Sequence, residues 1–157
     1  MNSMLAIGCD HAAVNLKKAV MAHLDEKHIA YVDFGTNGES CDYPDIAEKV
    51  CNEIIYGTAE KGILLCGTGV GMSIAANKIK GIRAAVCNDC FSTRYTRKHN
   101  DANVLCMGER VIGTGLALEL VDIFLETDFE GGRHQRRVDK ITELEVKSMY
   151  DGDENYE

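Results

Sequence analysis

The chain contains five short apolar runs, each followed by a segment of helical periodicity, and this alternation restricts the folds open to it. Short apolar strands of this kind are buried on both faces, which is typical of a parallel sheet covered by helices. Because crossovers between parallel strands are right-handed, we predict an α/β three-layer αβα sandwich. Its sheet is expected to be Rossmann-like, open, parallel and five-stranded, with strands at residues 4–9, 29–34, 62–66, 83–87 and 103–107.

Between and after these runs, apolar residues recur at the spacing of amphipathic helices. In the first expected helix, which follows Asp10 as its predicted cap and reaches Glu26, the residues that recur at helical spacing are Ala13, Leu16, Lys17, Val20 and Leu24. The other expected helices cover residues 44–56, 70–79, 90–98, 114–125 and 135–150. The chain has 157 residues, a length that favours one domain, which we assign to residues 1–150. The acidic tail, residues 151–157, lacks a core-forming pattern and is expected to be mobile.

Charge and cysteine content exclude several classes of protein. The net charge of −8 argues against a nucleic-acid binder or a protein of the membrane surface. The start of the chain shows no signal-peptide pattern, and no apolar run is long enough to span a membrane. Seven cysteines, an odd number, indicate reduced thiols in a cytoplasmic protein. Cys87 and Cys90 lack a second Cys or His pair at zinc spacing, so we interpret them as structural.

Polar residues follow several of the expected strands. Asp10 and His11 follow the first, Asp42 and Tyr43 follow the second after a loop, and Cys66 ends the third. Ligands of doubly wound folds bind at the carboxyl ends of the strands. We therefore expect these side chains to converge on one ligand site.

The segment from Cys66 to Gly71 places a thiol where a strand stops, with glycines at 67, 69 and 71 before a helix. Free main-chain N–H groups at such a turn bind anions and lower the pKa of nearby thiols in general. This arrangement suggests chemistry on a phosphorylated or enolate-forming substrate. The glycine spacing fits neither the phosphate loop of nucleotide hydrolases nor the dinucleotide motif. The alternative is a tight turn in which Cys66 only fills the core.

Two basic segments stand out in this acidic chain. The first, residues 94–100, contains His99, whose imidazole titrates near neutral pH and suits acid–base catalysis. In the second, residues 131–137, Arg133 and Arg137 share one helical face, which suits a phosphate group. The alternative for both is exposed charge at a helix end.

Five motifs, in order along residues 4–148, together resemble the ribose-5-phosphate isomerase type B family, which in the wider sense includes galactose-6-phosphate isomerase subunits. These motifs are residues 8–13, 42–45, 67–71 with 75–78, 97–103 and 132–138. The resemblance implies aldose–ketose isomerisation of a small-molecule sugar phosphate, here ribose 5-phosphate and ribulose 5-phosphate, through a cis-enediolate. It also implies that the reaction needs no metal and no organic cofactor.

The resemblance implies a role for each site residue. Cys66 is the expected base, because Met72 stands where another subgroup of the family carries a glutamate base. His99 would open the sugar ring. The enediolate oxygens would be held by Thr68 and the main-chain N–H groups of Gly67, Gly69, Val70 and Gly71. The remaining implied contacts are Asp10 and Tyr43 to sugar hydroxyls, His11, Arg133 and Arg137 to the phosphate, and Asn100 and Arg110 to complete the pocket.

In the family that the chain resembles, the active site lies between two subunits. The resemblance therefore implies a homodimer, or a dimer of such dimers, in which the partner supplies His99, Asn100 and Arg110. Two alternatives stay open. The substrate could be a six-carbon phosphate such as allose 6-phosphate or galactose 6-phosphate, or the chain could be a non-catalytic sugar-phosphate-binding subunit.

Overall fold

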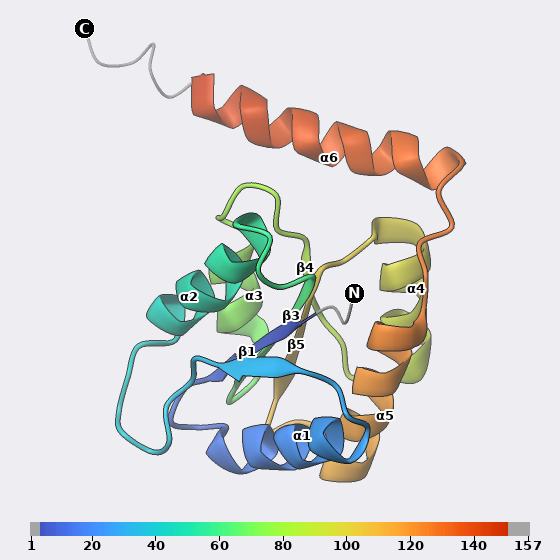
Figure 1. Ribbon diagram of the computed structural model, residues 1–157. Helices are drawn as coiled ribbons and strands as arrows, with labels where there is room; N and C mark the ends of the chain where they lie inside the picture. The colour runs from blue at the N-terminus through green and yellow to red at the C-terminus, as the bar shows by residue number, and fades with distance from the viewer. Residues whose placement is uncertain (1–3, 151–157) are drawn as a thin grey trace, which may run out of the picture.

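The computed structural model describes residues 4–150 of the protein, and these form five strands and six helices (Figure 1). The strands are β1 Leu5–Cys9, β2 Tyr31–Asp33, β3 Lys61–Cys66, β4 Ala84–Val86 and β5 Val104–Gly108. The helices are α1 Val14–Glu26, α2 Tyr43–Ile55, α3 Val70–Ala76, α4 Cys90–Asn100, α5 Thr114–Glu126 and α6 Arg133–Tyr150.

All strand pairs are parallel, and the strand order is β2-β1-β3-β5-β4. Figure 1 shows α2 and α3 on one side of the sheet and α1 and α5 on the other, with α4 beside α5. The predicted three-layer sandwich with a five-stranded parallel sheet is therefore confirmed.

The sheet separates two apolar cores, because successive side chains of a buried strand point to opposite faces. In β3, Ile63 and Leu65 pack toward α1 and α5, whereas Leu64 and Cys66 pack toward α2 and α3. Residues Leu16, Val20 and Leu24 of α1 are buried against the first core, as their spacing predicted. The thiol of Cys66 thus ends a strand that is held firmly on both faces.

The helix starts differ from the prediction in detail. Asp10 does not cap α1: its carboxylate accepts the N–H of Ala12 over 2.9 Å, and the N-cap residue is Ala13. A main-chain N–H of the first turn of α1 instead has a partner in the loop after β5: the Leu16 N–H donates to the Glu109 carboxylate over 2.6 Å. This bond ties α1 to the loop after β5, a long-range contact that no local sequence pattern reveals.

Helix α6 crosses above the rest of the molecule in Figure 1 and packs against it by a few residues. Val138 is buried, and the Glu145 carboxylate accepts the N–H of Gly81 over 3.1 Å. On the same helix, Leu144 and Met149 are 66% and 59% exposed, so α6 presents uncovered apolar side chains. No helix within residues 4–150 is long and apolar enough to cross a membrane, and the acidic tail lies outside the described residues.

Candidate active site

A cavity of about 280 Å³ opens at the carboxyl ends of β1 and β3. These strands are neighbours, yet α1 and α3, which follow them, lie on opposite faces of the sheet. Such a point of divergence is where ligands bind in doubly wound folds. The cavity is lined by Asp10, His11, Ala12, Tyr43, Cys66, Gly67, Thr68, Gly71 and Arg110. The predicted convergence of strand-end residues is therefore present in a single chain.

Cys66 is the last residue of β3, and the main-chain N–H of Gly69 donates to its Sγ over 3.1 Å. The sulfur of Cys66 therefore accepts a hydrogen bond from the turn that follows it. Gly69 adopts a φ of 80°, and a side chain there would meet the Met107 main chain at 2.9 Å. The residue must be glycine for the amide to turn back toward the thiol.

Thr68 and Gly71 complete the turn around the thiol. The Thr68 hydroxyl accepts the N–H of Val70 over 3.3 Å, which leaves its own proton to donate to a ligand oxygen. Gly71 lies against the ring of Tyr43, where a Cβ would approach the ring carbons to 2.8 Å. Tyr43 therefore forms one wall of the cavity. The Val70 side chain is exposed and does not line the cavity.

Asp10 and His11 form the wall from the end of β1. Asp10 is buried, and His11 is exposed with its Nδ1 accepting the N–H of Cys41 over 3.4 Å. In a neutral ring this bond places the remaining proton on Nε2. His11 is thereby set up as a hydrogen-bond donor to a ligand.

Arg110 corrects one expectation. Its guanidinium lies over Gly67 of the same chain, with Nη1 3.5 Å from the place where a Cβ of Gly67 would sit. The resemblance implied that the partner subunit supplies this arginine to the site. Because Arg110 follows β5, and β5 pairs with β3, it lies at the same sheet edge as Cys66. The cavity of one chain thus holds its own positive charge.

Two other buried thiols, Cys9 and Cys51, have raised pKa values and do not line the cavity. Burial raises the pKa of Cys9 to about 12, although the nearby Lys17 ammonium opposes the shift. Burial also raises the pKa of Cys51 to about 12. Met72 is fully buried in the second core and takes no part in the cavity lining. The catalytic thiol candidate is therefore Cys66.

His99 and Asn100 lie elsewhere. They end α4, which runs back along the sheet, and the Arg83 guanidinium just before β4 donates to the Asn100 carbonyl over 3.0 Å. They therefore lie at the amino edge of the sheet, whereas Cys66 lies at the carboxyl edge. The six residues of β3 separate the two edges by about 16 Å. One chain does not bring His99 to Cys66.

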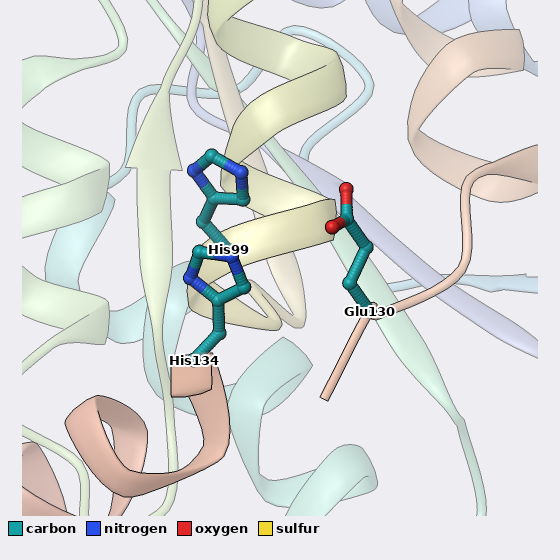
Figure 2. Close-up of side chains that lie close together, drawn as sticks. All are labelled: His99, Glu130 and His134. Atoms are coloured by element: carbon teal, nitrogen blue, oxygen red, sulfur yellow. The ribbon is translucent and has the colours of Figure 1, made fainter. Parts of the chain in front are cut away.

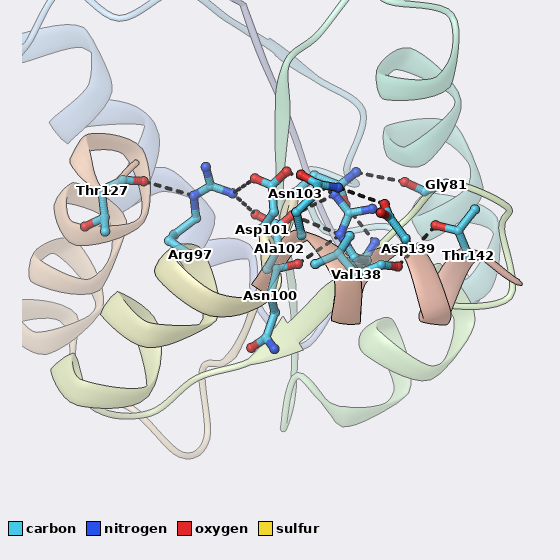
Figure 3. A network of polar contacts seen from close by, with 12 residues as sticks. Gly81, Arg97, Asn100, Asp101, Ala102, Asn103, Thr127, Val138, Asp139 and Thr142 are labelled. Carbon is cyan, nitrogen blue, oxygen red and sulfur yellow. Dashed lines mark hydrogen bonds and ion pairs between the residues drawn. The ribbon is translucent and has the colours of Figure 1, made fainter. Parts of the chain in front are cut away.

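The end of α4 is rigid. Figure 3 shows Arg97 reaching from α4 to the Thr127 carbonyl on one side and to Asp101 and Ala102 on the other. These bonds have lengths of 3.1, 2.9 and 2.6 Å, and Arg97 is itself buried. His99 is therefore presented from a fixed helix end.

His99 also belongs to a row of four neighbouring rings, in which Tyr95 meets it edge-on and His134 stacks on it. The centroid distances are 4.4 Å from Phe91 to Tyr95, 4.9 Å from Tyr95 to His99 and 4.0 Å from His99 to His134. The two imidazoles are nearly parallel, at 11° (Figure 2). The sequence interpretation gave His134 no role; the spacing of 91, 95 and 99 on one helix face was the available signal.

Arg133 and Arg137 are exposed on the first turns of α6, next to His134. Burial of the ring, together with the charges of His99 and Arg133, lowers the pKa of His134. The basic residues of α6 and the end of α4 thus form a second polar cluster. In a single chain, Arg133 and Arg137 do not line the Cys66 cavity.

A thiol, an amide-rich turn and an arginine at the switch point of a doubly wound sheet are the features of an enzyme site for a small anionic ligand. Comparison with known proteins narrows this class. Residues 5–141 match the model of the family described as Ribose/Galactose Isomerase. The chain therefore belongs to the ribose/galactose isomerase family.

Relatives within this family are close over nearly their whole length. Ribose-5-phosphate isomerase B of Escherichia coli (strain K12) is 49% identical, over 91% of this chain and 97% of the relative. The structure of Clostridium thermocellum ribose-5-phosphate isomerase B has a TM-score of 0.91 at 50% identity, covering 92% and 99%. That of Mycoplasma genitalium, with bound ribulose-5-phosphate, has a TM-score of 0.88 at 42% identity, covering 93% and 98%.

Proposed function

We propose that the protein is an aldose–ketose isomerase that interconverts ribose 5-phosphate and ribulose 5-phosphate. The observation that carries this proposal is the bond from the Gly69 N–H to Cys66 Sγ inside the cavity of about 280 Å³. A thiolate held in this way is a base at the end of a strand, surrounded by groups that bind hydroxyls and anions. The family membership and the ribulose-5-phosphate bound to the Mycoplasma genitalium relative favour this substrate pair.

The proposed chemistry is a proton transfer between adjacent carbons. The Cys66 thiolate removes the C2 proton of the open-chain aldose, and the electron pair of that C–H bond forms the C1=C2 bond of a cis-enediolate. The thiol then returns the proton to C1, while a hydroxyl proton moves from O2 to O1, so that the carbonyl ends at C2. The Thr68 hydroxyl donates to an enediolate oxygen as its charge develops.

The main-chain N–H groups of the glycine turn divide into two roles in this proposal. The Gly69 N–H is engaged by Cys66 Sγ, and the Val70 N–H by the Thr68 hydroxyl. The N–H groups of Gly67 and Gly71 remain for the substrate. Asp10 and Tyr43 contact the sugar hydroxyls, and His11 and Arg110 lie at the same cavity.

The site is completed by a second copy of the chain in this proposal, giving a homodimer. The partner supplies four residues to the site. Its His99 opens the furanose ring, its Asn100 completes the pocket, and its Arg133 and Arg137 bind the phosphate. The support is topological: His99 and Asn100 lie at the other edge of the sheet from Cys66, and Arg133 and Arg137 of the same chain do not line its cavity. Exposed apolar residues on α6, among them Leu144 and Met149, offer the surface that such a dimer would cover.

The experiment is a turnover comparison of ribose 5-phosphate with allose 6-phosphate and galactose 6-phosphate. We expect the highest kcat/KM for ribose 5-phosphate, since the cavity must hold both the reacting carbons and the phosphate contacts. A higher value for either six-carbon sugar would reassign the substrate. Binding without turnover of all three would instead make the protein a non-catalytic sugar-phosphate-binding subunit.

A further inference from the structure

We propose that His99, Glu130 and His134 form a site for a divalent ion of the zinc class, and that a bound ion inhibits the isomerase. The ion is an inhibitor here and plays no part in the reaction itself. Figure 2 shows the two imidazole rings one over the other, with the Glu130 carboxylate beside them. The site lies outside the Cys66 cavity of the same chain.

The ligand set matches this class of metal. One ligand atom from each of the three residues lies within 4.8 Å of the others. Two imidazole nitrogens and one carboxylate oxygen are the protein ligands of zinc in several metalloenzymes, at metal distances of about 2.0–2.2 Å. Tetrahedral geometry at these lengths places ligand atoms about 3.4 Å apart. The ligand atoms must therefore close by up to about 1.4 Å, through movement of the exposed Glu130 side chain and rotation of one imidazole ring.

A second observation points to a ligand independently of this grouping. His134 is buried, with only 5% of its surface exposed. Its Nε2 nevertheless has no hydrogen-bond partner among the residues that the structure describes. A buried polar atom without a partner costs roughly 1–3 kcal/mol. Coordination of a metal ion would satisfy this nitrogen. The two rings are stacked nearly parallel, at 11°, so one of them must turn before its nitrogen and that of the other ring can point at the same ion.

The surrounding charges limit the affinity but leave the ligands accessible. Lys98 Nζ lies 3.6 Å from the Glu130 carboxylate and must give way to the ion. That pair is partly exposed, so its loss costs at most about 1 kcal/mol. The neighbouring Arg133 and Arg137 add repulsion. Because two of the three ligands are imidazoles, borderline ions such as Zn²⁺ and Co²⁺ are favoured over the hard ions Mg²⁺ and Ca²⁺, which prefer oxygen ligands.

Inhibition, unlike binding, rests on the proposed function, because it assumes that His99 opens the sugar ring. An imidazole nitrogen bound to a metal ion no longer exchanges protons with the substrate. Binding and inhibition are therefore measured separately. If zinc binds at these three residues without inhibition, the metal site stands and the assignment of His99 falls.

The binding test is a titration of the reduced protein with Co²⁺, followed by the visible absorption of tetrahedral cobalt, and then by Zn²⁺ displacement. Glu130→Gln and His134→Gln are each expected to weaken binding by more than about tenfold. Glu130 is exposed, so its variant keeps the fold even if the buried His134 variant does not. The matched controls are Glu143→Gln and His28→Asn, both exposed and outside the cluster.

Binding that both cluster variants leave unchanged would overturn the proposal and assign the metal to the cysteine thiols. The second readout is turnover in the presence of Zn²⁺, reversed by a chelator. We expect the wild-type protein to be inhibited and Glu130→Gln to resist inhibition while keeping its metal-free activity. Equal inhibition of wild type and Glu130→Gln would contradict an inhibitory role for this site.

Discussion

The main-chain N–H of Gly69 donates to the Sγ of Cys66 over 3.1 Å, so the N-cap residue of α3 also holds the sulfur. The bond depends on the left-handed conformation of Gly69, φ 80°, which points its amide back toward the end of β3. The position of the Cys66 thiol and the conformation of the glycine turn thus depend on each other. Changing either residue should affect the other.

Replacing Cys66 by alanine should reduce kcat by about 10²–10⁴-fold, the usual contribution of a positioned base. The fold should remain, because a cavity side chain at the end of a strand is lost without removing a large buried volume. The measurement is turnover of ribose 5-phosphate, with thermal unfolding as the check on folding. Cys90→Ala, a half-buried cysteine on α4, is the control and should keep full activity. Full turnover by Cys66→Ala would remove the proposed base.

Gly69→Ala should lower both stability and activity. The left-handed conformation costs a side-chain-bearing residue about 1–3 kcal/mol, and the new Cβ would meet the Met107 main chain at 2.9 Å. The amide would then move away from Cys66. Gly115→Ala is the control: nothing lies near its Cβ position, and within α5 the change should stabilise by about 0.5–1 kcal/mol. Urea unfolding compares the two; equal stabilities would contradict the strain argument.

Arg137→Ala should raise KM for ribose 5-phosphate by roughly 10- to 100-fold, since it would remove charge-assisted hydrogen bonds to the phosphate. Arg136→Ala is the matched control, because that side chain points about 100° away around α6. Steady-state kinetics on both variants measure the difference. An unchanged KM in Arg137→Ala would place the phosphate elsewhere, with His11 and Arg110 as the remaining basic groups of the cavity.

The ionisation of Asp122 should make the free energy of unfolding depend on pH. Burial alone would raise the pKa of its carboxyl group, but hydrogen bonds from Lys27 and His23 outweigh burial and lower it below 3.8. A lowered pKa stabilises the fold above the ordinary value and loses that effect as pH falls through the folded one. Asp122→Asn should therefore cost about 0.5–1 kcal/mol at pH 7 and less at pH 3.5. Urea unfolding at both pH values checks this, and a constant difference would contradict it.

Much of the fold follows from local patterns in the sequence. Leu16, Lys17, Val20 and Leu24 recur on one face of α1, and all four are buried. The presence of a lysine on that face is explained only by the tertiary structure. Its Nζ lies 2.9 Å from the Asp33 carboxylate, at the end of β2, and a buried charge requires such a partner.

The site was predictable where it is local and unpredictable where it is not. Cys66, Thr68 and the glycines lie in one turn, and Asp10 and His11 follow the neighbouring strand, so the parallel topology brings them together. The contact of Tyr43 with Gly71 and the stack of His99 on His134 join segments far apart in the chain. Their partners depend on helix packing, which leaves no periodic signal in the sequence.

We propose that each active site combines Cys66 of one chain with His99 of its partner. The direct measurement mixes two variants, Cys66→Ala and His99→Asn, each expected to be inactive, and lets their subunits exchange. Random pairing makes half of the dimers mixed, and each mixed dimer has one intact site of its two, because a two-fold interface is self-complementary. We expect recovery of about a quarter of wild-type activity. A mixture that stays as inactive as either parent, although mixed dimers are present, would contradict a shared site.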